Sequence, residues 1–235
     1  MSNPDRHVDA DLSDFSGSAS LFPLPNAVFF PQTLFPLHIF ERRYRKMTED
    51  ALAGDRLIAM ALLEPGWELL ADDDVPPIHP IVCLSMITAE KKLPDGRYHL
   101  VLQGLSRARV VGEEQYDLPY RVGQLDLCLD DESDLTEAEN QRIREDLLRS
   151  HQLLHPDLAV HAMSLLGQGL SGNLPLGVFC DVLASALGLP PAENQRILAE
   201  QNVLKRGRLV LEAMKTEAAR RQATPLHFPP KFSRN

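Results

Sequence analysis

The chain has 235 residues, of which 44% are hydrophobic and 24% charged, and its formal net charge is −9. This length allows one large domain or two small ones with buried cores, and the acidic balance argues against general affinity for nucleic-acid phosphates. Three cysteines, Cys83, Cys128 and Cys180, lie far apart within apolar runs. They predict reduced core residues of a cytoplasmic protein.

Residues 1–18 are acidic and rich in small residues, without an apolar core. They predict a flexible tail and argue against a signal peptide or a membrane-spanning helix. Residues 223–235 are expected to form a second tail.

Two proline-broken apolar runs precede a charged helix between Leu21 and Met47. Proline removes a backbone N–H and keeps its neighbours extended, so it is tolerated at sheet edges, strand starts and bulges. The spacing of Phe40, Tyr44, Met47 and Ala51 predicts one buried face of a helix. Gly54 is predicted to end that helix in the left-handed conformation.

Strands dominate the next part of the chain. Leu57 to Leu63 is a short apolar run that predicts a strand buried on both faces. Two long β-rich segments, 81–93 and 97–111, flank Pro94, Asp95 and Gly96, whose turn chemistry predicts a hairpin. Within these strands Gly104 and Gly112 indicate bulges or bends, and Pro119 to Leu129 predicts a further strand. This strand content favours a small, highly curved barrel, which has few exposed edges.

The composition changes at Asp130 to Asp134, and the sequence beyond it is helical in pattern. Thr136 and Glu139 fit a capping box at the first helix start. Further helices are predicted over 157–166, 175–187, 192–201 and 203–221, with Asn173 as a cap and Gly188 as a terminator. The predicted domains are therefore 19–130 and 131–222.

Several segments, taken in order, resemble one known family. They are FPLHIFERRYRKM (Phe35–Met47), ALAGDRLIAMALL (Ala51–Leu63) and LPDGRYHLVLQGLSRARV (Leu93–Val110). Together they resemble the N-terminal substrate-recognition domain of Lon-type ATP-dependent proteases, in its stand-alone form. The resemblance implies an α+β fold with a PUA-like β-barrel, one or two helices beside it, and a C-terminal α-helical bundle.

The resemblance also implies a non-catalytic module that binds unfolded or apolar polypeptide segments and works with a separate protease or chaperone. The candidate substrate-binding residues are aromatics in proline-flanked or looped segments: Phe29, Phe30, Phe35 and Trp67. The alternative for each is a place in the core; for Trp67 this is a ring folded back over it. PUA-like domains include RNA binders, which gives the alternative of an RNA-binding module, although the sequence lacks a basic stripe with interleaved aromatics.

No catalytic or ligand-binding pattern in the sequence predicts an enzyme. Gly167, Gly169 and Gly172 have dinucleotide-binding spacing but no preceding strand, so they predict a loop. His151 and His155, with His161 nearby, lack the carboxylate and the unbroken helix of a hydrolytic zinc site. The chain contains no Gly-Lys pair of a phosphate-binding loop and no motif that activates a serine. We therefore expect no catalytic residues, no metal and no cofactor, and neither peptidase nor ATPase activity.

Overall fold

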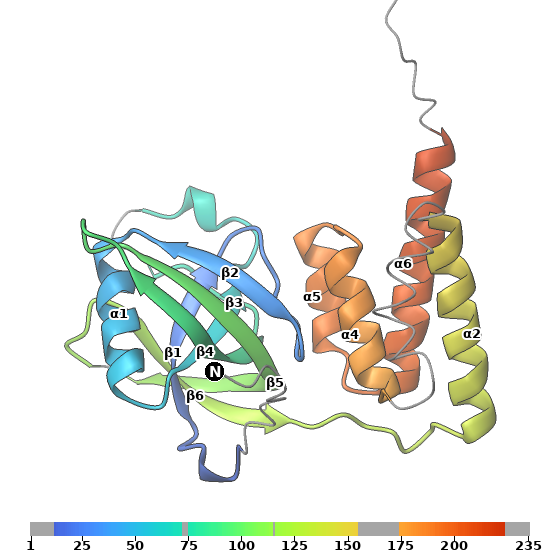
Figure 1. Ribbon diagram of the computed structural model, residues 1–235, viewed down its shortest axis with the longest axis horizontal. Helices are drawn as coiled ribbons and strands as arrows, with labels where there is room; N and C mark the ends of the chain where they lie inside the picture. Colours follow the sequence, from blue (N-terminus) through green and yellow to red (C-terminus); the bar gives the residue numbers. More distant parts are fainter. Residues whose placement is uncertain (1–11, 72–74, 115, 155–173, 224–235) are drawn as a thin grey trace, which may run out of the picture. The chain divides into compact units, whose positions relative to one another are not determined.

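The computed structural model describes residues 12–71, 75–114, 116–154 and 174–223, and its fold is α+β (Figure 1). The chain divides into two compact units. The first contains Met1–Leu129 and Pro190–Gln201, and the second contains Asp130–Leu189 and Asn202–Asn235. The predicted domain ranges differ from these units mainly over 190–201, which were predicted to belong to the helical domain. The domain boundaries themselves stay a prediction.

The first unit is built on a six-stranded sheet in the order β2-β5-β4-β3-β1-β6. Its strands are β1 (Ser18–Leu24), β2 (Leu34–Ile39), β3 (Leu57–Leu62), β4 (Ile81–Lys92), β5 (Tyr98–Glu114) and β6 (Arg121–Cys128). An additional pairing of β5 with β6 joins the two sides of the sheet, so five strands form a closed ring and β2 is attached to it through β5.

Strand β5 pairs with β4 from Tyr98 to Arg109, and two different strands share its other edge. Its first part pairs with β2, up to Leu34 opposite Gln103, and its later part pairs with β6, from Arg107 onward. Gly104 lies between the two. There Gln32 N donates to Gly104 O at 2.8 Å, and Gly104 N donates to Thr33 O at 3.0 Å.

The sheet carries a hydrophobic core on each face. One core contains Phe22, Ile58 and Met60 from the sheet with Tyr44 and Met47 from helix α1 (Arg42–Ala53). The other contains residues of the opposite parity, such as Leu57 and Ala59 of β3. All six residues of β3 are buried, which confirms the predicted strand buried on both faces.

The predicted hairpin and bulges are confirmed. Leu93 N donates to Arg97 O at 2.8 Å across a turn in which Gly96 has a φ of +82°. The β4–β5 register shifts opposite the residues next to Gly104, and the β5–β6 register shifts between Val110 and Gly112.

Two details of the first helix were predicted wrongly. Helix α1 begins at Arg42, so Phe40 precedes it and is 62% exposed, while Tyr44, Met47 and Ala51 form the buried face. Gly54 does end the helix, but with a φ of −108°. The left-handed residue in this turn is Arg56, with a φ of 67°, and its Nε donates to Ile87 O at 2.9 Å.

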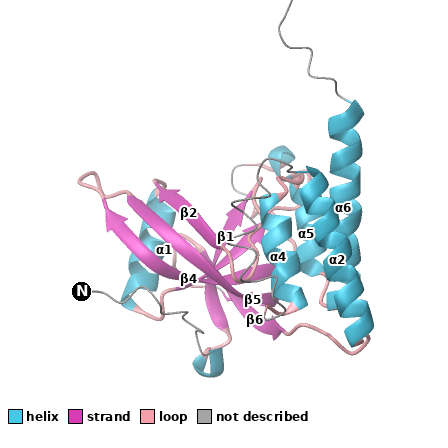
Figure 2. Ribbon diagram, turned by 45° about the vertical axis from the view of Figure 1, so that its right-hand side comes forward, coloured by secondary structure: helices cyan, strands magenta, loops and turns pink. Residues whose placement is uncertain are grey.

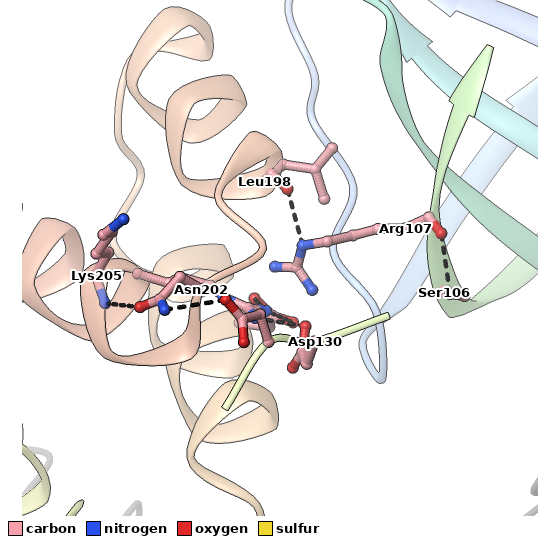
Figure 3. A network of polar contacts seen from close by, with 9 residues as sticks. Ser106, Arg107, Asp130, Leu198, Asn202 and Lys205 are labelled. Atoms are coloured by element: carbon pink, nitrogen blue, oxygen red, sulfur yellow. Dashed lines mark hydrogen bonds and ion pairs between the residues drawn. The ribbon is translucent and has the colours of Figure 1, made fainter. Parts of the chain in front are cut away.

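The last element of the first unit is helix α5 (Pro191–Ala199). It packs on β4. Gln195 Nε2 donates to Ile81 O at 2.8 Å. Arg107 Nε of β5 donates to Leu198 O at 2.8 Å, as Figure 3 shows. These two side-chain bonds to backbone carbonyls, both buried, fix the helix against the sheet.

The second unit contains helices α2 (Glu137–Leu154), α4 (Leu176–Ala186) and α6 (Val203–Ala223). Helix α6 packs against both α2 and α4, and the three run side by side in Figure 2. The predicted capping box is confirmed, because Glu139 N donates to Thr136 Oγ1 and Thr136 N donates to Glu139 Oε2, both at 3.2 Å. Helix α6 is capped by Asn202, whose Oδ1 accepts from Lys205 N at 2.9 Å (Figure 3).

An ion-pair cluster in this unit is built around a buried arginine. The side chain of Arg206 is fully buried, and its guanidinium contacts Asp130 at 2.5 Å and Asp181 at 3.3 Å. Burial lowers the pKa of Arg206, but the two carboxylates outweigh this effect and leave the pKa raised. Gly177 leaves the space for the Asp130 carboxylate, since a Cβ there would lie 2.0 Å from Asp130 Oδ2.

Several predicted features lie outside the described residues. They are the two tails in large part, the helix over 157–166, the glycines at 167–172, His155, His161 and the Asn173 cap. The predicted terminator Gly188 is described, and its φ of +63° confirms a left-handed end after α4.

Gly104→Ala tests the close approach between β5 and the segment before β2. A Cβ at this position would lie 2.2 Å from Phe30 O, a backbone atom that cannot rotate away. We expect a loss of unfolding free energy of roughly 1–3 kcal/mol or more in urea denaturation. Gly112→Ala is the matched control in the same strand, since its Cβ would meet only Gln124 Oε1 at 3.5 Å; equal losses in the two variants would contradict the account.

Arg206→Met tests the buried cluster. Removing the cation leaves two carboxylates without their buried partner, so we expect a loss of roughly 3–5 kcal/mol of unfolding free energy. Arg149→Met, which breaks ion pairs of a side chain that is 69% exposed, should cost below about 1 kcal/mol. Urea denaturation of both variants measures the difference, and a similar small cost in each would show that the cluster is not stabilising.

Candidate functional site

A pocket of about 640 Å³ opens in the first unit beside the ends of β1 and β2. It is lined by β1 residues Phe22, Pro23 and Leu24 on one side and by β2 residues Leu37, His38 and Ile39 on the other. The start of α1, Trp67 and the segment before β6 complete its wall. We call this feature the seam pocket, and its volume lies in the range of small-molecule and cofactor sites.

Strand pairing explains why a pocket forms here. Strand β1 pairs with β6 over Ser18–Leu21, whereas it continues beside β3 as far as Leu24. The β6 side of its last residues therefore faces the pocket. Strand β2 is the end strand of the sheet. Pro23 and Pro36 each remove an N–H from these strands, which disfavours closure of the gap by further strand pairing.

Aromatic and aliphatic side chains form both the base and the rim of the seam pocket. The base is buried and contains Phe22 and Tyr44, whose rings meet edge to face at 4.5 Å. The rim is accessible and contains Phe40, Leu118 and the half-buried Trp67. Exposed apolar groups around an apolar hollow are typical of a binding surface.

A tyrosine–carboxylate pair fixes one wall of the pocket. Tyr120 Oη donates to Asp50 Oδ2 at 2.7 Å, and Lys46 Nζ contacts Asp50 Oδ1 at 2.5 Å. Burial, then the hydrogen bond to Asp50, raises the pKa of Tyr120 to about 12. Burial raises the pKa of Asp50, but the bonds from Lys46 and Tyr120 outweigh it and the net pKa is lowered. Tyr120 is therefore held as a neutral donor at neutral pH.

The lining residues Glu41, Arg43 and Arg121 are held in ion pairs and hydrogen bonds. Arg43 pairs with Glu41 at 3.0 Å and lies over the Tyr44 ring at 4.6 Å. Arg121 donates from Nε to Glu113 at 2.8 Å and from a terminal nitrogen to Pro76 O at 2.7 Å. Burial raises the pKa of the Tyr44 hydroxyl. These pairs fix the wall and leave the apolar groups as its accessible part.

The structure separates the four residues predicted to bind substrate. Phe29 and Phe30 are buried in the sheet unit, Phe30 completely. Phe35 is partly buried against the same core, with its ring 5.4 Å from that of Phe29. Trp67 lines the seam pocket, where the other three are absent from the wall. Their role in binding stays a prediction.

Phe40, Leu118 and Tyr120 were not predicted as site residues. Phe40 was assigned to the buried helix face, although it precedes Glu41, the residue before α1. Leu118 and Tyr120 come directly before β6, which begins at Arg121, two residues later than predicted. The position of Phe40 was a signal in the sequence, because an aromatic residue between a strand and the charged start of a helix can also remain outside the core.

Within residues 12–71, 75–114, 116–154 and 174–223, no three or more His, Cys, Asp or Glu side chains gather as they would to hold a metal ion. In the same part of the chain, no helix is long and apolar enough to span a bilayer. All three cysteines are buried thiols.

Comparison with known proteins places this geometry in a family. Residues 19–216 match the model of the ATP-dependent protease La (LON) substrate-binding domain. The chain is 27% identical over 194 residues to a Lon protease of Trichlorobacter lovleyi, covering 79% of this chain and 22% of that protein. It is 28% identical over 200 residues to Lon protease 2 of Myxococcus xanthus, covering 83% and 23% respectively.

Two solved structures share the fold. The Lon N-terminal domain protein from Xanthomonas campestris superposes with a TM-score of 0.60 at 24% identity, covering 83% of this chain and 97% of its own. The N-terminal domain of Mycobacterium avium complex Lon protease gives a TM-score of 0.61 at 14% identity, covering 84% and 98%. The chain belongs to the LON substrate-binding domain family, and it spans about a quarter of the length of the curated relatives it matches.

The Tyr120–Asp50 bond predicts a specific pH dependence. The pKa of Tyr120 is about 12 in the folded chain against an ordinary value of 10.0 for tyrosine, so between these values the unfolded chain loses a proton that the folded chain keeps. The contribution to stability is complete below about pH 10 and is lost as the pH rises toward 12. As the pH rises through this interval, urea denaturation should show a smaller loss of unfolding free energy for Tyr120→Phe than for the parent chain.

Absorbance titration of tyrosinate provides the direct check. The difference between the parent chain and Tyr120→Phe should titrate near pH 12, and in an Asp50→Asn background it should titrate at lower pH, because the accepting carboxylate is gone. A difference signal that titrates near pH 10 in both backgrounds would contradict the hydrogen bond.

Proposed function

We propose that the chain is a non-catalytic module that binds unfolded or apolar polypeptide segments, with the seam pocket as its binding site. The observation that carries the proposal is the accessible rim of Phe40, Leu118 and Trp67 around an apolar base in a chain of the LON substrate-binding family. Aromatic side chains in a hollow act as anchors for a partner chain.

In this proposal the side chains of the seam pocket recognise a polypeptide and take no part in catalysis. The hydroxyl of Tyr120 and the lining arginines are held in hydrogen bonds and ion pairs, which suits a fixed wall. ATP hydrolysis and peptide cleavage would belong to a separate protease or chaperone that acts with this chain. The predicted alternative of an RNA-binding module has no specific observation in its favour.

Two predictions about the fold and one about the cellular location accompany the proposal. The closed sheet is a PUA-like barrel, supported by the β5–β6 pairing. Residues 131–222 form a helical domain with a bundle, supported by the packing of α6 against α2 and α4. The protein acts in the cytoplasm, in keeping with its buried thiols.

Trp67 is the only tryptophan in the chain, so its fluorescence reports directly on the seam pocket. Titration with an unfolded casein peptide should shift its emission to the blue, because a bound segment removes water from the indole. Phe40→Ala and Leu118→Ala should each weaken binding, and Trp67→Ala, measured with a labelled peptide, should raise Kd at least about tenfold.

Leu153→Ala is the control for these variants. It truncates a leucine that is 79% exposed on α2, so it removes a comparable apolar surface outside the pocket. Thermal unfolding should be unchanged in this variant and in Phe40→Ala. Peptide affinity that responds equally to Leu153→Ala and Phe40→Ala, or to neither, would remove the seam pocket as the binding site.

A further inference from the structure

The solvent-facing side of β2, β5 and β4 carries ordered rows of side chains. Strand register aligns Leu34 with Gln103 and Met86, and the next row is Pro36, Val101 and Ala89. A third row consists of His38, His99 and Lys91. We call the second of these the apolar row and the third the basic row.

Burial confirms that these rows share the outer face. The side chains of Pro36, His38, His99, Ala89 and Lys91 are exposed and Val101 is half-buried, whereas the alternate residues Leu100 and Leu102 point into the core. A groove of about 490 Å³ runs over this face and is lined by the apolar and basic rows. Leu34 extends its apolar surface and is 67% exposed.

The basic row has accessible positive charge. The imidazoles of His38 and His99 meet edge to face, with ring centroids 5.0 Å apart, and Lys91 is the cross-strand neighbour of His99. In the described part of the chain no ion pair engages Lys91.

The acids around this row are engaged elsewhere. Glu90 of β4 pairs with Arg56 at 2.5 Å, and Asp95 of the turn pairs with Arg97 at 2.6 Å. On the α1 side of His38, Glu41 pairs with Arg43. The row is thus locally positive on a chain whose net charge is −9, and charge complementarity favours an acidic group opposite it.

We propose that this face binds an extended polypeptide segment in which two apolar residues and an acidic residue alternate with other residues. Along an extended chain, alternate residues are about 6.8 Å apart, which equals the spacing of successive rows on a strand. Two apolar side chains then cover the rows of Leu34 and Pro36 while the carboxylate meets the basic row. The inference rests on the proposed function and adds a charge preference at a surface next to the seam pocket.

The apolar row decides between polypeptide and nucleic acid as the occupant. A phosphate backbone presents a charge at every nucleotide and needs a run of cations, whereas this face offers one basic row beside two rows with apolar members. The overall negative charge also opposes a polyanion. A segment with few charges and apolar neighbours fits both features.

The test compares three short labelled peptides by fluorescence anisotropy at low salt. The first carries Leu-Thr-Val-Thr-Glu between polar ends, the second has Lys in place of Glu, and the third has Glu moved by one position. We expect the first to bind roughly tenfold more tightly than the second and more tightly than the third.

Variants locate the effect. Lys91→Gln and the double variant His38→Gln, His99→Gln should each lower the ratio of Glu-peptide affinity to Lys-peptide affinity roughly threefold. Lys215 is an exposed lysine of α6, so Lys215→Gln is the matched control and should leave the preference for the Glu peptide unchanged. Thermal unfolding of each variant shows that the fold is intact.

The outcomes separate this inference from the proposed function. Peptide binding that depends on Trp67 but is equal for Glu and Lys peptides overturns the inference and leaves the seam pocket standing. A charge preference that persists in all basic-row variants also overturns it, as does tighter binding of single-stranded RNA than of the acidic peptide. If the parent chain binds none of the peptides, both the inference and the proposed function are rejected.

Discussion

The architecture of the sheet unit depends on how one long strand is shared. Strand β5 pairs with β4 from Tyr98 to Arg109, while its other edge pairs first with β2 and later with β6. The change occurs at Gly104, where the backbone of residues 30–33 crosses close to the strand. Only glycine allows that approach, because any Cβ would overlap Phe30 O. The curvature, the end position of β2 and the site all follow from this division.

The division leaves a gap that side chains line and no strand fills. Because β6 pairs with β1 only as far as Leu21, the last residues of β1 face β2 across the seam pocket. The prolines of both strands reduce their capacity for further pairing. The same end position of β2 exposes its outer face, where Pro36 and His38 stand in ordered rows with β5 and β4. Two neighbouring surfaces therefore share one structural cause.

The fold was more predictable from the sequence than the site was. Hairpin, bulges, capping box and the doubly buried β3 each depend on local chemistry or on period, and these signals are strong. Burial of particular aromatics depends on which strands meet, which no local pattern specifies. Phe29 and Phe30 lie in a proline-flanked segment, as residues of an exposed loop would, yet both are buried, and the backbone of Phe30 lies against Gly104. Phe40 fits the helical period but lies before the helix and outside the core.

The seam pocket as a polypeptide site is the central claim, and photo-crosslinking tests it most directly. An unfolded apolar peptide carrying a benzophenone is irradiated with the full chain, and the attachment sites are mapped by mass spectrometry. The account predicts adducts concentrated on the pocket rim, at Phe40, Trp67 and Leu118, and their loss in competition with unlabelled peptide. Competable adducts confined to helices α2, α4 or α6 would contradict it.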